Sequence, residues 1–441
     1  MTSALPDARD IAARALVRVE RDGAFAAAAL DAEVQRAPQL SPRDRAFATE
    51  LLYGTLRVLP WLEGRIDAYA KKPIGTLDPK TRAPLLLGAY QLFFARVPAF
   101  AAVDGAVEAL RRAGGTHVAG FGNAVLRRLA REANERPPVL RDAIVASAAP
   151  WLREALERAL GKEEALRFLE AEEPPVGLRV PRPEMRAVYM ERLAAARPDA
   201  TFAEGRVSPL AILARGAGKP QALPGHAEGE LFVQEEGSQA IALAVGAKPG
   251  DTVLDACAGR GNKAAILAGA VGDGGAVDVC DLHEAKLERL RDELRRYGLA
   301  ARNAFAVDWT VGSGDVTGTY DRVLVDAPCS GVGTLRRRPD LLLRRTEASL
   351  GDLAQMQLSI LEHVAPHVKP GGRLVYAVCS VLREEGEDVV ERFLAARPDF
   401  ALVPFDAEVL ATLAKDASML RLLPQLHGTD GYFLASFRAP T

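Results

Sequence analysis

The chain has 441 residues, of which 49% are apolar, enough for sizeable cores in two or three domains. Its four cysteines have no paired short spacing, which argues against a disulfide framework and against a zinc site. Residues 1–10 lack a signal-peptide layout, and no apolar run is long enough to span a membrane. We therefore expect a cytoplasmic protein with no membrane partner and no metal.

The charge is unevenly distributed along the chain. Residues 1–140 carry 20 Lys and Arg against 15 Asp and Glu, so this part has a net charge of +5 and the remainder −7. A basic N-terminal part on a mildly acidic remainder suits a polyanionic partner. An ordinary solvated helical surface explains the charge equally well.

Residues 1–140 are predicted to form a helical bundle, because apolar residues recur there with helical spacing. Two such faces are Ile11, Ala15, Leu16 and Val19, and Leu51, Leu52, Thr55, Leu56 and Leu59. Ser41 before Pro42 is typical of a helix start. Further helices are expected at residues 85–94, 103–112 and 123–131.

A small α+β module is predicted for residues 141–229. It follows a proline-containing linker at 134–139 and opens with a helix from Pro150 to about residue 172. Strands are expected at 177–180 and 209–214, and a helix at 185–195.

Residues 230–441 alternate between strand and helix patterns, which predicts a parallel, doubly wound, Rossmann-like α/β domain. The strands are expected at 252–255, 276–281, 304–308, 322–326, 373–379 and 431–437. The helices between them are expected at 262–270, 284–297, 350–363 and 385–395.

Acidic residues follow three successive strands of this domain, at Asp255, Asp281 and Asp308. After Asp255, a turn with Gly259 and Gly261 would let the backbone approach a ligand. An acid about twenty residues farther on can accept hydrogen bonds from ribose hydroxyls. This layout predicts an S-adenosylmethionine pocket, although each aspartate could instead merely cap a loop. The expected cofactor-binding residues are Asp255, Cys257, Ala258, Gly259, Gly261, Lys263, Asp281, Asp308, Asp326 and Pro328.

Two further strands each lead into a Cys-Ser pair, at Cys329 and Cys379. A thiolate that adds to C6 of cytosine makes C5 nucleophilic enough to take a methyl group. Asp326 suits a hydrogen bond to pyrimidine N3, and the second thiol suits release of the product. The residues leave open which cysteine attacks, and each could be a small buried hydrophobe. We expect the thiols of Cys257 and Cys280 to be structural.

One lysine and a run of arginines are further candidates for the site. Lys263 could neutralise the site or lower the pKa of a thiol, or it could be an idle surface lysine. An arginine run lies beside the reactive loop and suits phosphate contacts, or is simply an exposed basic face. The run consists of Arg336, Arg337, Arg338, Arg344 and Arg345.

The stretches 326–340 (DAPCSGVGTLRRRPD), 355–361 and 374–380 (LVYAVCS) resemble the NOL1/NOP2/Sun family of RNA cytosine-C5 methyltransferases. Glu384 with Glu385, and residues 231–239 and 428–433, are similar to that family as well. Residues 46–57, 87–92 and 122–128 resemble the NusB-like RNA-binding fold. The resemblance implies a 16S ribosomal RNA methyltransferase in which Cys379 is the nucleophile and Cys329 assists release. DNA cytosine methyltransferases would instead point to Cys329, whose Pro-Cys pair they share.

The chain departs from the family pattern at several positions. Arg260 and Asn262 stand where the family has a proline and a glycine in the cofactor loop, so the family's contacts from these two positions to the methionine end of the cofactor are not carried over. Pro181 stands where the family has asparagine, so an RNA contact from that asparagine is not carried over. Trp309 after Asp308 is unusual and could close over the adenine or only pack.

We expect a monomer that methylates C5 of one cytosine in small-subunit ribosomal RNA, with the target base flipped out of its stack. One alternative is an RNA-binding protein with a decayed methyltransferase domain, which the intact Asp326, Cys329 and Cys379 disfavour. An exocyclic amino methyltransferase would want an Asn/Asp-Pro-Pro-aromatic loop and no thiol.

Overall fold

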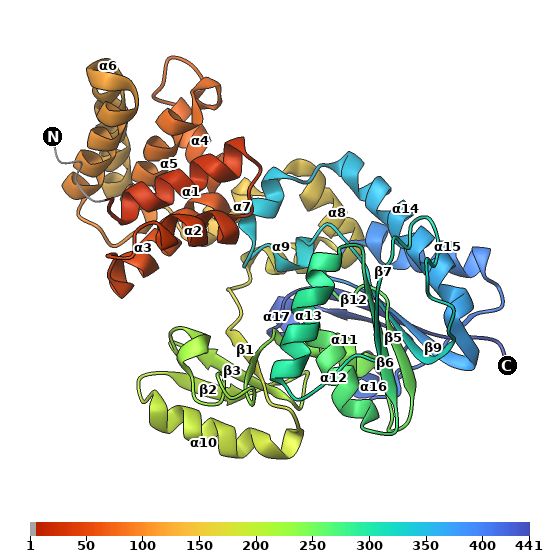
Figure 1. Ribbon diagram of the computed structural model, residues 1–441. Coiled ribbons are helices and arrows are strands. Elements are labelled where there is room, and N and C mark those ends of the chain that lie inside the picture. Colours follow the sequence, from red (N-terminus) through yellow and green to blue (C-terminus); the bar gives the residue numbers. More distant parts are fainter. Residues whose placement is uncertain (1–5) are drawn as a thin grey trace. The chain divides into compact units, whose positions relative to one another are not determined.

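The computed structural model describes residues 6–441 (Figure 1). Residues 1–5, part of the segment for which we expect no signal peptide, lie outside the described residues. Contacts divide the chain into two compact units. The helical unit comprises the described residues up to Glu154 together with Glu163–Glu170 and Leu335–Arg345, and the sheet unit comprises Ala155–Lys162, Ala171–Thr334 and Thr346–Thr441. Within residues 6–441, no helix has both the length and the apolar character needed to cross a membrane.

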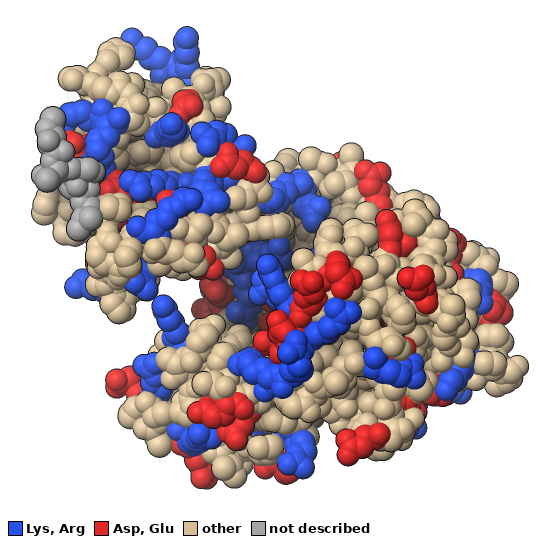
Figure 2. Space-filling model, viewed as in Figure 1, with Lys and Arg blue, Asp and Glu red and all other residues tan. Residues whose placement is uncertain are grey.

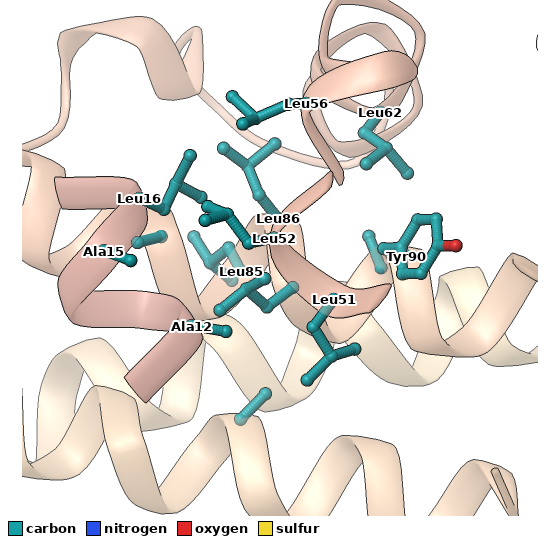
Figure 3. Packing of buried hydrophobic residues seen from close by; sticks show 14 of the residues in the cluster. Ala12, Ala15, Leu16, Leu51, Leu52, Leu56, Leu62, Leu85, Leu86 and Tyr90 are labelled. Carbon is teal, nitrogen blue, oxygen red and sulfur yellow. The ribbon is translucent and has the colours of Figure 1, made fainter. Parts of the chain in front are cut away.

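The N-terminal part of the helical unit is a bundle, as the sequence predicts. Its helices are α1 (Ala8–Arg21), α2 (Ala26–Gln35), α3 (Pro42–Arg57), α4 (Leu59–Asp67), α5 (Pro79–Phe94), α6 (Ala99–Glu135) and α7 (Leu140–Ser147), with a 3-10 turn η1 (Ile74–Thr76). Figure 3 shows the leucines of α1, α3 and α5 interdigitating around Leu52 and Leu85. The Tyr90 ring lies over the backbone of Gly54, where a Cβ atom would be only 2.1 Å from the ring.

Ser41 caps α3 as predicted, because its side chain accepts a hydrogen bond from the Asp44 amide.

Three helix boundaries in this region differ from those expected. Leu59 belongs to α4, since the chain leaves helical geometry at Val58. The helices expected at 103–112 and 123–131 are joined into α6, which is kinked where Gly115 adopts a φ of 77°. The single helix expected from Pro150 is two helices, α8 (Pro150–Leu160) and α9 (Lys162–Glu170), separated at Gly161, whose φ is 80°.

The sheet unit contains a small four-stranded antiparallel sheet in the order β2-β3-β1-β4. These strands are β1 (Val176–Arg179), β2 (Thr201–Glu204), β3 (Ala211–Arg215) and β4 (Phe232–Val233), accompanied by α10 (Arg186–Ala196) and the 3-10 turns η2 (Pro183–Met185) and η3 (Pro220–Ala222). Leu178, Tyr189 and Leu193 pack between this sheet and α10. The edge strands β2 and β4 were not among the expected elements.

The large sheet has the order β10-β12-β9-β8-β5-β6-β7, with β11 paired to β12. Its strands are β5 (Thr252–Asp255), β6 (Ala276–Asp281), β7 (Asn303–Ala306), β8 (Tyr320–Asp326), β9 (Val368–Val378), β10 (Ala401–Leu402), β11 (Met419–Leu422) and β12 (Tyr432–Arg438). The five strands from β5 to β9 pair in parallel, whereas β10, β11 and β12 pair antiparallel. The predicted parallel, doubly wound sheet is confirmed for β5 to β9, and the prediction of parallel pairing is wrong for the C-terminal strand β12, which pairs antiparallel with β9.

Helices cover both faces of the large sheet, as a Rossmann-like domain requires. Successive residues of β8 face opposite sides, so Val323 and Val325 enter one core and Leu324 the other. The first core includes α14 (Glu347–Val364) and α15 (Glu387–Ala396), and the second includes α11 (Glu236–Ala244), α12 (Asn262–Val271), α13 (Glu284–Arg296) and α16 (Glu408–Ala414). The remaining turns are η4 (Val332–Thr334), η5 (Pro339–Leu343), η6 (Ala365–His367), η7 (Arg383–Glu385) and α17 (Pro424–His427).

Candidate active site

The candidate site lies at the carboxyl ends of the parallel strands, where open α/β sheets bind their ligands. Asp255 ends β5, Asp281 ends β6 and Asp326 ends β8, while Cys379 directly follows β9. Because β8 lies between β5 and β9, the order of the sheet brings Asp326 between the glycine-rich turn and Cys379.

The two cysteines lie together, as their positions after adjacent strands predict. Cys329 Sγ and Cys379 Sγ are 3.0 Å apart, and both residues are partly exposed. The hydrogen bond with Cys379, burial and neighbouring negative charge all raise the pKa of the Cys329 thiol well above its usual range. Cys329 therefore stays protonated at neutral pH.

Lys263, in the first turn of α12, forms an ion pair with Asp326. Burial lowers the pKa of Lys263, but the charges of Asp326, Asp255 and Cys379 outweigh burial and raise it. Lys263 is thus a half-buried ammonium group, paired with Asp326 and within electrostatic range of the thiol pair, and not an unpaired surface lysine.

Asp255 is fully buried, and neither carboxylate oxygen has a hydrogen-bond partner among the described residues. Burial raises its pKa to about 7, against the lowering effect of Lys263. An orphaned buried carboxylate fits a cationic ligand group, such as the ammonium or sulfonium of S-adenosylmethionine.

The turn between β5 and α12 has the open backbone that a cofactor loop needs. Gly259 has a φ of 56°, and a Cβ atom there would meet nothing within 4 Å. Gly261 has a φ of 84° and begins α12, and no side chain among the described residues caps the first amide groups of this helix, which can therefore bind an anionic group such as a carboxylate. Ala258 is fixed by its amide, which donates to the Cys280 carbonyl at 2.8 Å.

The other two aspartates of the expected cofactor site differ in their surroundings. Asp281 is buried, accepts a hydrogen bond from the His283 amide and pairs with Lys286 at 3.0 Å. Asp308 lies two residues beyond β7 and is exposed, because the strand ends earlier than expected, at Ala306. Its carboxylate accepts from the Thr310 hydroxyl and amide, which lowers its pKa. Asp308 thus caps its own turn, which was the alternative interpretation.

Three further residues near this edge of the sheet, Cys257, Cys280 and Trp309, have structural roles. Burial raises the pKa of Cys257 well above its usual range, and also that of Cys280, so neither thiol is activated. Trp309 is buried and donates from Nε1 to the Ala256 carbonyl at 2.9 Å, so its indole packs in the core.

A buried polar network that the sequence did not indicate surrounds the Cys329 loop. Glu385 is fully buried and accepts hydrogen bonds from the Ser330 amide at 2.7 Å and from the Ser330 hydroxyl at 2.5 Å. Gln357 Nε2 donates to Glu385 at 3.1 Å and to the Pro328 carbonyl at 2.9 Å. Pro328 itself is exposed. The only sequence signal was that Gln357 and Glu385 fall in stretches that resemble the family.

Much of the arginine run is occupied by contacts within the helical unit. Arg57 donates to the Arg336 carbonyl at 2.9 Å, and the Arg336 guanidinium lies over the Phe168 ring. Arg338 and Arg344 both lie over the Phe25 ring. Three of the five arginines therefore pack on aromatic rings, which favours a structural role for them over a free phosphate-binding face.

The sheet order, the glycine-rich turn and the acids after successive strands together define a class I methyltransferase domain, which follows a helical domain in the sequence. Residues 241–438 match the family model described as 16S rRNA methyltransferase RsmB/F, and residues 6–131 match that of the NusB family. The chain is 33% identical to a probable ribosomal RNA small subunit methyltransferase B of Synechocystis, over 98% of this chain and 99% of that relative. The chain belongs to the RsmB/F family of 16S rRNA methyltransferases.

A second relative agrees with this assignment, and a solved structure shares the fold. A probable ribosomal RNA small subunit methyltransferase B of Bacillus subtilis is 34% identical, with 98% of each chain covered. The crystal structure of PH0851 superposes with a TM-score of 0.79 at 24% identity, covering 97% of this chain and 98% of that one. The likeness to PH0851 shows that the fold is shared along the chain.

Proposed function

We propose that this protein transfers a methyl group from S-adenosylmethionine to C5 of a cytosine in 16S ribosomal RNA, through a covalent bond between a cysteine and C6. The observation that supports this proposal most directly is the pair of thiols 3.0 Å apart beside the Lys263–Asp326 ion pair. Methyl transfer to an exocyclic nitrogen or to a ribose oxygen needs no thiol, whereas transfer to C5 needs one to attack and gains from a second that assists release.

Cys379 is the proposed nucleophile. Its Sγ would bond to C6, and C5 would then carry enough electron density to take the methyl group. The raised pKa of Cys329 keeps that thiol protonated, which disfavours it as the attacking thiolate. The ammonium of Lys263 lies within electrostatic range of Cys379, where it would stabilise negative charge on sulfur.

Asp326 and Lys263 are proposed to act on the pyrimidine ring. As Cys379 attacks C6, N3 gains electron density and needs a hydrogen bond or a proton. Asp326 lies at the strand end next to the thiols, and Lys263, bonded to it, is an ammonium that can supply this proton. After methylation, a base takes the C5 proton, N3 returns its proton to Lys263, and the sulfur–C6 bond breaks with its electron pair going to Cys379. Cys329 is placed to be that base, because its hydrogen bond with Cys379, the first cause of its raised pKa, is absent once Cys379 is bonded to C6.

The residues of the glycine-rich turn would hold the cofactor, which supplies an electrophilic methyl group. Asp255 offers an unpaired buried carboxylate to a cationic part of the cofactor, and the start of α12 offers free amides to its carboxylate. Asp281 would bind the ribose hydroxyls. Leu282, directly after it, is 56% exposed and offers an apolar surface to the adenine.

The helical unit is proposed to contribute RNA contacts. Figure 2 shows Lys and Arg side chains predominating over Asp and Glu on the displayed face of this unit. A hollow of about 400 Å³ is lined by Arg65, Tyr69, Arg128, Arg131, Glu132, Glu135 and Arg136. Arg128, Arg131 and Arg136 are exposed, and none of them forms an ion pair within residues 6–441; Arg128 also lies over the Tyr69 ring, while Arg131 and Arg136 have no such ring contact among the described residues. Unpaired arginines around a hollow suit the phosphates of an RNA strand.

The test is to look for a protein–RNA adduct that survives denaturing electrophoresis, using 16S RNA or small ribosomal particles, S-adenosylmethionine and three proteins. We expect wild type to methylate without accumulating adduct, Cys329→Ala to accumulate adduct, and Cys379→Ala to give neither adduct nor methyl transfer. Cys280→Ala is the matched control, because that thiol is buried in β6 away from the pair, and it should behave as wild type. Methylation by Cys379→Ala would contradict the proposed nucleophile, and methylation at another atom would contradict the proposed reaction.

A further inference from the structure

We propose that Glu385 is the positioning residue for Cys329, holding its thiol beside Cys379 so that the product is released. This inference rests on the proposed function, because it concerns the step that frees Cys379 after methyl transfer. Nothing in the charge pattern of the sequence singles out Glu385, which lies in a short 3-10 turn fifty-five residues or so after the loop that it holds.

The contacts of Glu385 converge on the two residues that flank Cys329. Oε1 accepts from the Ser330 amide at 2.7 Å and Oε2 from the Ser330 hydroxyl at 2.5 Å. On the other side, Gln357 Nε2 bridges Oε1 of Glu385 and the Pro328 carbonyl, at 3.1 and 2.9 Å. The backbone is therefore fixed immediately after Cys329 by the carboxylate itself, and immediately before it by Gln357, which the same carboxylate holds.

The backbone of Glu385 and the side chain of Gln357 are themselves held in place. The Tyr376 hydroxyl lies 2.7 Å from the Glu385 carbonyl oxygen and 3.0 Å from Gln357 Oε1, so its single proton serves either partner. Tyr376 belongs to β9, the strand that leads to Cys379. The network thus connects the loop that carries one thiol to the strand that carries the other.

The use of a carboxylate here needs an explanation beyond stability. Glu385 is 0% exposed, and within the described part of the chain it forms no ion pair with Lys or Arg. A buried carboxylate without a cation is costly unless hydrogen bonds fully satisfy it, and an apolar residue would avoid that cost. What an apolar residue could not do is accept hydrogen bonds from both groups of Ser330 and from Gln357 at once. We therefore explain the presence of a carboxylate at position 385 by the hydrogen bonds that it accepts, which fix the location of the Cys329 thiol.

Positioning and charge can be separated by substitution. In Glu385→Gln, the amide oxygen can keep the two N–H donors on Oε1, and the new amino group can donate to the Ser330 hydroxyl, which is able to accept. In Glu385→Ala all three hydrogen bonds are lost. If Glu385 acts by position, Glu385→Gln releases product as wild type does and Glu385→Ala does not.

The experiment mixes each variant with RNA and S-adenosylmethionine and follows methylation and denaturation-stable adduct in the same samples. We expect Glu385→Ala to complete a first methyl transfer and then accumulate adduct, as Cys329→Ala does, with release slowed by about tenfold or more, since a factor of ten needs only one lost hydrogen bond. Glu385→Gln should not accumulate adduct. In a Cys329→Ala background, Glu385→Ala should leave the release rate unchanged.

Two results would overturn the inference. One is normal release by Glu385→Ala, and the other is parallel loss of adduct and methylation, which indicates a general structural role. If Glu385→Ala does not fold, Gln357→Leu removes the bridge to Pro328 and is read by the same criterion. The proposed methylation mechanism is tested separately from the role of Glu385. If Cys329→Ala traps adduct and the Glu385 and Gln357 variants do not, only the proposed positioning role of Glu385 is contradicted. If Cys379→Ala methylates, the proposed function fails first.

Discussion

Replacing Asp255 by asparagine should make the apo protein more stable at pH 8 and should weaken its binding of the cofactor. Asp255 is fully buried with no hydrogen-bond partner among the described residues, and burial raises its pKa from 3.8 to about 7. Above pH 7 the folded protein must keep a desolvated charge there that the unfolded chain exposes to water. Asparagine has nearly the same shape and carries no charge.

The shift in the pKa of Asp255 determines the sign and the size of this change in stability. A carboxyl whose pKa is higher in the folded state is most favourable to folding below the unfolded pKa of 3.8, and this contribution is lost as pH rises to about 7. A shift of this size corresponds to about 4 kcal/mol of unfolding free energy, at about 1.4 kcal/mol per unit. Between pH 5 and pH 8, the advantage of Asp255→Asn over wild type should therefore grow by about 3 kcal/mol.

The assay is urea unfolding of both proteins at pH 5 and pH 8, without cofactor. Hydrogen exchange of peptides from β5 and β6 restricts the readout to the sheet unit, and equal denaturant slopes show that the same surface unfolds. Titration with S-adenosylmethionine at pH 8 should then show weaker binding by the variant. A stability difference that does not change with pH would refute the reasoning, and so would unchanged cofactor affinity together with the expected stability change.

Two further predictions concern other parts of the chain. Gly333→Ala would place a Cβ 1.9 Å from the Gly431 carbonyl oxygen, so we expect thermal unfolding of the sheet unit to show a loss of about 1–3 kcal/mol. Since the Gly333 amide also donates to the Cys379 carbonyl at 3.1 Å, single-turnover methylation should slow as well, and wild-type kinetics would contradict the contact. Replacing both Arg128 and Arg131 by alanine should weaken RNA binding and reduce its logarithmic salt slope by roughly 1.4, with the single-turnover rate at saturating RNA unchanged. Arg127→Ala, outside the hollow, is the control, and an equal loss there would contradict a specific site.

The features that the sequence predicted are those set by local patterns. The alternation of strands and helices predicts the α/β domain, and a strand that ends in Asp255 before a Gly-x-Gly turn predicts where a ligand approaches. The same logic places Cys329 and Cys379 together, because parallel neighbours end at one edge of the sheet. The bundle followed from helical periodicity and from caps such as Ser41.

The errors arose where a boundary or a partner depends on residues far away in the chain. The local sequence of β12 does not predict that it pairs antiparallel with β9, because a buried strand has the same apolar pattern in a parallel and in an antiparallel pair. Asp308 was expected to end a strand that stops at Ala306, and periodicity does not fix an edge strand to within two residues. The division of the chain into three domains, at residues 140 and 229, stays a prediction.

The residues that the sequence could not reveal are those that act through another segment of the chain. Cys329 could be recognised because thiols at strand ends are chemically conspicuous, whereas Gln357 looks like any polar residue of an amphipathic helix. Only the folded structure shows that Gln357 is fully buried and bridges the Pro328 carbonyl and Glu385. A reactive group must be exposed to its substrate at a strand end, and buried groups that do not contact the substrate must hold it in position. The exposed group can be recognised from its local sequence, because its residue type and its place after a strand are visible there. The buried groups can be recognised only from their contacts in the folded structure.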